Sequence, residues 1–159
     1  SHVQMRPLQP ASVQVEQLVH EVVGEFAAQL RGGATVERDV EAGVLHCDRE
    51  GTMQILRNFL SNALKFAGGS ARIRIEGRRL PHGYRFAVRD NGPGFDMRYH
   101  DRIFHLFHRL PDAGDQPGTG IGLALAARAA ERMGGRVWAE SVPGEGAAFF
   151  FELDEGALA

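Results

Sequence analysis

Apolar residues recur every three to four positions in three stretches of the chain, which predicts three amphipathic helices. Ser12 and Asp48 precede the first two stretches and are expected to be their N-caps. A pair of glycines follows each of the three stretches, as is typical of helix C-termini. The helices are expected from Ser12 to near Gly32-Gly33, from Asp48 to about Phe66, and from about Ile121 to Met133.

Alternating apolar and polar residues predict strands between these helices. Short turns that contain glycine join the strands two by two, so we expect three hairpins. The paired segments are 35–40 with 44–47, 71–79 with 84–89, and 136–140 with 147–153. Because helices separate the hairpins, the pattern favours an α+β fold over a doubly wound α/β sheet. We expect a two-layer sandwich with a mixed, mostly antiparallel sheet of about five strands, covered by three helices on one face and largely solvated on the other.

The composition is that of one soluble globular domain of 159 residues and 17.4 kDa. A net charge of −2 argues against a general nucleic-acid binder, and no apolar run approaches the length that crosses a bilayer. We therefore expect a cytoplasmic location without membrane contact by this domain. The expected division is a tag remnant and extended lead-in at 1–10, the domain at 11–155 and a tail at 156–159.

Asn58, Asn62 and Lys65 form a polar stripe on the second helix, opposite its apolar face. Asparagine is a mediocre helix former, so two on one stripe favour a ligand-binding role. Carboxamide oxygens suit a hard cation, and the ammonium of the only lysine in the chain suits phosphate. The alternative is an ordinary solvated helix face.

Two glycine-rich segments offer further binding sites. Asp90-Asn91-Gly92-Pro93-Gly94 follows a strand, where the carboxylate can accept a hydrogen bond from a ligand amino group. Gly118-Thr119-Gly120-Ile121-Gly122-Leu123 opens the third helix, whose free N–H groups favour phosphate. The second segment is neither a Walker A loop nor a dinucleotide fingerprint. Between the two segments lies a long loop, and Phe104 and Phe107 are expected to anchor it.

Taken together and in this order, the four clusters resemble the N, G1, F and G2 boxes of sensor histidine kinases. The resemblance is to their catalytic and ATP-binding domain, a Bergerat-type fold shared with gyrase-type ATPases, and covers about residues 12–153. It implies that the domain binds ATP and Mg²⁺ and donates the γ-phosphoryl group to a histidine on a separate dimerisation domain, with a response regulator downstream. Whether the parent kinase is anchored in a membrane stays open. The residues implied in nucleotide binding are Asn58, Asn62, Lys65, Phe66, Asp90, Gly92, Gly94, Arg109, Gly118, Thr119, Gly120, Gly122 and Leu123.

The resemblance also implies individual roles. Asn62 would give its side-chain oxygen to Mg²⁺, and Lys65 would contact phosphate. Asp90 would accept from the adenine amino group. Asn58 is the implied catalytic residue, at the position where gyrase-type ATPases place a glutamate base, and an amide cannot be that base. Residues from about 95 to 117 would form a mobile ATP lid.

Several features depart from the family pattern or compete with it. Gly146-Ala147-Ala148-Phe149 lacks the hydroxyl residue that usually precedes the last aromatic strand, which points to weaker nucleotide binding. His20 lies on the first helix of the domain and is not expected to be the phosphoacceptor. His100, His105 and His108 are expected on the lid surface and not in a metal site. The alternatives are a nucleotide-binding regulatory module without transfer and an anti-sigma-type serine kinase.

Overall fold

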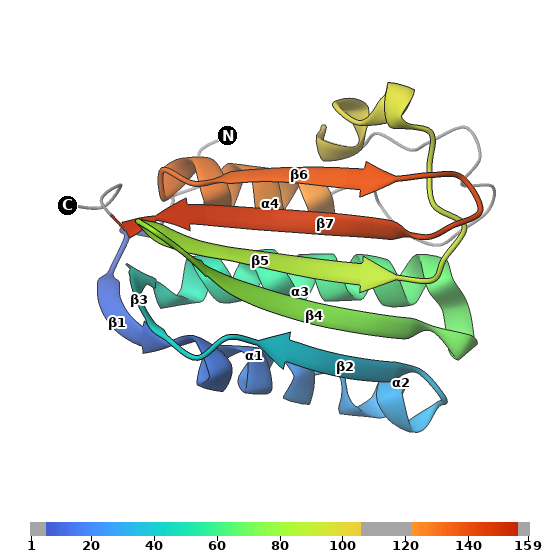
Figure 1. Cartoon of the computed structure of the whole chain (residues 1–159), viewed down its shortest axis with the longest axis horizontal. Helices are drawn as coiled ribbons and strands as arrows, with labels where there is room; N and C mark the ends of the chain where they lie inside the picture. Colours follow the sequence, from blue (N-terminus) through green and yellow to red (C-terminus); the bar gives the residue numbers. More distant parts are fainter. Residues whose placement is uncertain (1–5, 106–121, 156–159) are drawn as a thin grey trace.

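The computed structural model describes residues 6–105 and 122–155. In these ranges, the chain forms strands, helices and three short 3-10 helices in the order shown in Figure 1. The elements are β1 (Pro10–Gln14), α1 (Val15–Gly24), α2 (Ala27–Arg31), β2 (Thr35–Val40), β3 (Val44–Asp48), α3 (Arg49–Ala67), η1 (Gly68–Ser70), β4 (Arg72–Leu80), β5 (Gly83–Asp90), η2 (Met97–Tyr99), η3 (Arg102–Phe104), α4 (Gly122–Arg132), β6 (Arg136–Ser141) and β7 (Ala147–Asp154).

The main sheet has five strands in the order β2-β4-β5-β7-β6. The β2–β4 pair is parallel and the other pairs are antiparallel. Helices α1, α3 and α4 lie on one side of this sheet, as Figure 1 shows. The predicted two-layer α+β sandwich with a mixed, mostly antiparallel sheet is therefore confirmed.

Two predictions for the first third of the chain are wrong. β2 and β3 do not pair as a hairpin, because β2 joins β4 in parallel while β3 pairs with β1 in a separate two-stranded sheet. The first helix does not begin behind Ser12, which lies within β1, and α1 starts at Val15 without a side-chain cap. It also ends early, at Gly24, and the buried Phe26 separates it from the short α2.

The core lies between the helices and the inner face of the sheet. α3 packs against α1, α4 and β5, so its apolar residues are at the centre of the domain. Phe59 of α3 contacts Phe149 of β7, with ring centroids 5.7 Å apart. In β5, Phe86 stacks on Phe151 of β7. Within the described ranges, no helix combines the length and the apolar character needed to cross a membrane.

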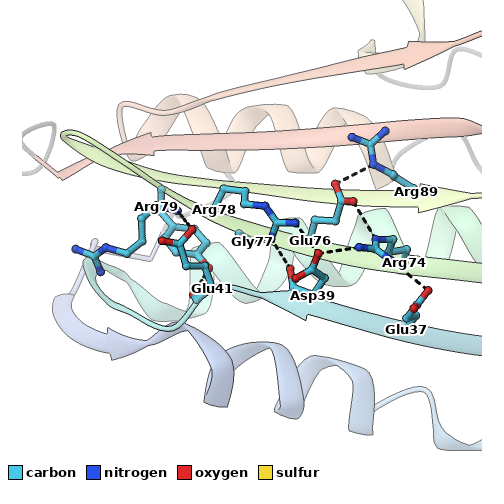
Figure 2. Close-up of polar contacts among 10 residues, drawn as sticks. Glu37, Asp39, Glu41, Arg74, Glu76, Gly77, Arg78, Arg79 and Arg89 are labelled. Atoms are coloured by element: carbon cyan, nitrogen blue, oxygen red, sulfur yellow. Dashed lines mark hydrogen bonds and ion pairs between the residues drawn. The ribbon is translucent and has the colours of Figure 1, made fainter.

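The outer face of the sheet carries alternating arginine and acidic side chains, which Figure 2 shows around β4. Arg74 contacts Asp39 at 2.7 Å and Glu76 at 3.0 Å, and Arg89 contacts Glu76 at 2.8 Å. Arg78 binds Asp39 from the other side, at 2.5 Å. Opposite charges meet across strands, so the face is compensated by its own side chains.

An aromatic stack extends this outer face over β6 and β7. Trp138 and Phe150 lie parallel, with ring centroids 5.0 Å apart, and the guanidinium of Arg136 lies 4.5 Å from the Trp138 ring. The predicted solvated face is therefore mostly polar. Its one stacked aromatic pair covers part of its apolar surface by ring stacking and by the guanidinium of Arg136.

The N-terminal segment is fastened to the starts and ends of the central helices. Arg6 donates to both carboxylate oxygens of Asp48, and the backbone N–H of Gln9 donates to Asp48 Oδ1 at 2.9 Å. Arg132, at the end of α4, donates to the carbonyl of Arg6. Asp48 also accepts from the N–H of Gly51 at 2.8 Å, which confirms it as the N-cap of α3.

Candidate functional site

Helix α3 presents the predicted polar stripe from its C-terminal half. The helix ends at Ala67 because Gly68 takes a φ of +78°, which disfavours residues other than glycine. Asn58 and Asn62 are half-buried, and Lys65 is exposed near the C-terminal end. The Nδ2 atom of Asn58 is buried and has no hydrogen-bond partner among the described residues. A buried amide donor without a partner is costly, so its position favours a ligand with acceptor atoms.

The loop after β5 lies against the end of α3. The Asp90 carboxylate is half-buried, and its Oδ1 accepts from the N–H of Gly92 at 2.8 Å. A Cβ added at Gly92 would lie 3.0 Å from that oxygen and 3.4 Å from Ala67 Cα, so the backbone approaches closely. Burial raises the pKa of Asp90 above its ordinary value, and the N–H groups of Gly92 and Ala147 offset only part of the effect. Because burial limits its access to water, the carboxylate can accept a further hydrogen bond from a ligand donor.

The first turn of α4 meets the α3 stripe. A Cβ added at Gly122, the first residue of α4, would lie 3.9 Å from Asn58 Oδ1. Leu123 packs against the hydrophobic core and fixes this turn. The helix N-terminus is thus beside the Asn58 side chain, and backbone N–H groups at such a terminus favour an anion.

The structure therefore brings the ends of three predicted clusters together: the α3 stripe, the Asp90–Gly94 loop and the start of α4. Phe66 is half-buried in the last turn of α3. Other predicted residues lie outside the described ranges, and their roles stay predictions. They are Phe107, Arg109, Gly118, Thr119 and Gly120.

The segment after the Asp90 loop is packed at several points. Phe95 and Ile103 are buried, and Phe104 packs against the main core, while its role as an anchor of the ATP lid stays a prediction. His100 is partly exposed, and its Nε2 also accepts from the N–H of Ala139 at 3.0 Å, a contact that was not expected of a lid-surface residue. This hydrogen bond gives a backbone N–H of the edge strand β6 a partner. A sequence pattern does not show such a contact.

His105 is exposed, and His108 lies outside the described ranges. In the part of the chain that the structure describes, no group of three or more His, Cys, Asp and Glu side chains is placed to hold a metal. His20 is exposed on α1, with its Nδ1 3.0 Å from the guanidinium of Arg38.

Two residues that hold the Asp90 loop were missed as functional residues. Asn91 accepts from the backbone N–H of Arg72 at 2.8 Å and so ties the loop to the start of β4. Ser141, the last residue of β6, binds the loop from the other side. Neither role has a local sequence signal, since both depend on which turns meet in space.

The residues present fit a nucleotide with its metal. The buried Asn58 amide and the α4 start offer donors for phosphate oxygens, and the Asn62 carboxamide is a suitable ligand for a hard cation. Asp90 offers a hydrogen-bond acceptor in the loop after β5, where the backbone of Gly92 leaves no room for a side chain.

Residues 47–157 match the family described as histidine kinase-, DNA gyrase B- and HSP90-like ATPases. Over 144 residues the chain is 39% identical to the phytochrome-like protein Cph1 of Synechocystis sp., covering 87% of this chain and 19% of that protein. The full-length structure of ShkA in complex with AMPPNP is 30% identical, with a TM-score of 0.82, over 93% of this chain and 31% of ShkA. The histidine kinase ThkA in complex with the response regulator protein TrrA has a TM-score of 0.80 at 23% identity, over 94% of this chain and 43% of ThkA.

This chain belongs to the histidine kinase-like ATPase family, and it resembles the catalytic domains of two-component sensor histidine kinases in sequence and fold. It spans about a fifth of the length of the curated relatives Cph1 and cyanobacterial phytochrome A.

Proposed function

We propose that this domain binds Mg-ATP and serves as the phosphoryl donor for a histidine on a separate dimerisation domain of the same parent kinase. The observation that carries the proposal is the buried Nδ2 of Asn58, which has no hydrogen-bond partner among the described residues, in a side chain whose Oδ1 faces the first residue of α4. ATP supplies the γ-phosphoryl group when it is bound. Support also comes from the family match and from the AMPPNP complex of the 30% identical ShkA.

Each side chain has one task in this proposal. Asn62 gives its carboxamide oxygen to Mg²⁺, and Asn58 and the α4 start bind phosphate oxygens. Lys65 contacts phosphate from the exposed end of the stripe. Asp90 accepts the exocyclic amine of adenine, and a guanine carbonyl at the same edge would face the carboxylate as an acceptor.

The amide at position 58 also sets the reaction type. Phosphoryl transfer needs an acceptor positioned in line with the γ-phosphate, whereas hydrolysis needs a base for water. Asn58 cannot remove a proton from water, so the site favours transfer to a protein side chain. The response regulator complex of ThkA supports a place for this domain upstream of such a regulator.

The metal arrangement is tested by calorimetry of ATP binding with and without Mg²⁺. We expect Asn62→Ala to abolish the enhancement that Mg²⁺ gives, while Ser61→Ala, the neighbouring residue on the same helix, retains it. Equal enhancement in Asn62→Ala and the unmodified chain would show that Asn62 is not the metal ligand.

The transfer itself is tested with radiolabelled ATP. We expect no label on this chain alone, and acid-labile label on a histidine-bearing dimerisation fragment once that fragment is added. Acid-stable label on this chain alone would reject histidine transfer and favour a serine kinase. ATP binding with no label on any fragment would favour a regulatory module.

A further inference from the structure

The hydroxyl of Ser141 joins two turns at the edge of the proposed nucleotide site. Its Oγ accepts from the backbone N–H of Phe95 at 2.9 Å and donates to the carbonyl of Gly146 at 2.6 Å. The single hydroxyl proton is used by Gly146, so the lone pairs face Phe95. This side chain therefore connects the segment after the Asp90 loop to the β6–β7 turn.

The backbones of the two turns also approach each other closely. A Cβ added at Gly94, which has a φ of +70°, would lie 2.7 Å from Ser141 Oγ and 2.7 Å from the carbonyl oxygen of Gly146. A Cβ added at Gly146 would lie 2.1 Å from the carbonyl oxygen of Asp90. The N–H of Gly144 donates to the carbonyl of Pro93 at 2.6 Å. The β6–β7 turn is thus the surface on which the Asp90 loop rests.

This contact extends toward Asp90, the carboxylate proposed above to accept the adenine amine. Asp90 ends β5, opposite Ala147 in β7, and its Oδ1 accepts from Gly92 inside the same loop. On the α3 side, Asn91 holds the loop through the N–H of Arg72. The loop is thus held from both sides, by Asn91 toward β4 and by Ser141 and Gly144 toward the β6–β7 turn, so the direction of the Asp90 carboxylate depends on both.

We propose that Ser141 is a positioning residue for base recognition: its hydroxyl holds the Asp90 loop in the conformation that selects adenine. The inference rests on the proposed function, since it concerns the same nucleotide site. Ser141 does not touch the nucleotide in this scheme. It acts through Phe95 and the β6–β7 turn on the angle at which Asp90 meets the base.

The decisive measurement is selectivity. We expect Ser141→Ala to weaken ATP binding about three- to tenfold, the effect of one net hydrogen bond, and to weaken GTP binding less. The ratio of ATP to GTP affinity, measured by competition, therefore falls. Ser141→Thr keeps the hydroxyl and should recover the ratio to within about twofold. Ser12→Ala, the same change at an exposed position of β1, is the control and should leave both affinities unchanged.

Three outcomes would overturn the proposal. The first is a Ser141→Ala variant whose ATP-to-GTP ratio equals that of the unmodified chain, even if both affinities fall, since a purely structural residue would act in that way. The second is a Ser141→Thr variant that behaves as Ser141→Ala. The third is fast hydrogen exchange of the Phe95 amide in the unmodified chain. This measurement does not depend on whether a variant folds. If the unmodified chain binds no ATP, the proposed function fails, while the Phe95 exchange still reports on the contact itself.

Discussion

Replacing Asp48 tests whether one buried carboxylate holds the N-terminal segment and α3 together. Asp48 is 1% exposed, and its two oxygens accept from Arg6, from the N–H of Gln9 and from the N–H of Gly51. Asp48→Ala removes all of these acceptors at once. Asp48→Asn keeps an oxygen for Gly51 but places a neutral amide against the guanidinium of Arg6.

The size of the effect follows from these contacts. Loss of an N-cap costs about 0.5–2 kcal/mol, and loss of hydrogen bonds to a charged partner costs about 1.5–3 kcal/mol. We therefore expect Asp48→Ala to lower the free energy of unfolding by about 3 kcal/mol. For a domain of this size, that corresponds to a fall in Tm of about 6–12 °C. Asp48→Asn should lose about half as much, because the cap to Gly51 survives.

The pH dependence gives a second test of the same contacts. Burial alone raises the pKa of Asp48, but hydrogen bonds from Arg6, Gln9 and Gly51 outweigh it and leave the pKa below its ordinary value. The stability from Asp48 is therefore present above the unfolded pKa of about 3.9 and is lost as pH falls through the lower folded pKa. The difference between the unmodified chain and Asp48→Asn should be full at pH 7 and shrink below about pH 4.

The assay is urea unfolding followed by circular dichroism at several pH values, with Asp154→Ala, an exposed acid at the end of β7, as control. The control should stay within about 0.5 kcal/mol of the unmodified chain. An Asp48→Ala variant with unchanged stability at pH 7, or a difference that does not shrink in acid, would refute the reasoning.

Two further predictions concern the site. Because burial raises the pKa of Asp90, the stability from this group is present in acid and is lost as pH rises through its raised pKa. Asp90→Asn should therefore raise the Tm of the ATP-free domain at neutral pH, and it should abolish the preference for ATP over GTP. A lower Tm would contradict the first expectation, and unchanged selectivity would contradict the second. Lys65 is exposed and is the only lysine, so an amine-acylating reagent has one side-chain target. Saturating Mg-ATP should slow the acylation of Lys65 several-fold, as measured by peptide mass spectrometry with the N-terminal amine as the reference. Equal rates with and without ATP would exclude a phosphate contact.

Local signals made α3 and the later hairpins predictable. Asp48 and Gly68 mark the two ends of α3, and glycine turns mark the β4–β5 and β6–β7 hairpins. The partner of β2 was not predictable, because a parallel pair is joined by a long connection that leaves no turn signal. The start of α1 was misplaced for a related reason, since β1 is a strand only through its distant partner β3.

The site shows the same division. The spacing of Asn58 and Asn62 on one helix, and the Asp90-x-Gly92-x-Gly94 run, are visible in the sequence because the residues are local. The contribution of Ser141 depends on a contact with Phe95, which lies 46 residues away along the chain, and only the folded domain shows it.

The parallel pairing of β2 with β4 has a consequence for the order of folding. The two strands are neighbours in the sheet, yet residues 41–71 run between them and contain all of α3. Closing so long a connection costs more chain entropy than closing the tight β4–β5 turn, so we expect β2 to join the sheet after α3 has packed. Opening at this edge would then release β2 first and leave α3 and β5, which carry residues of the proposed nucleotide site, packed in the domain.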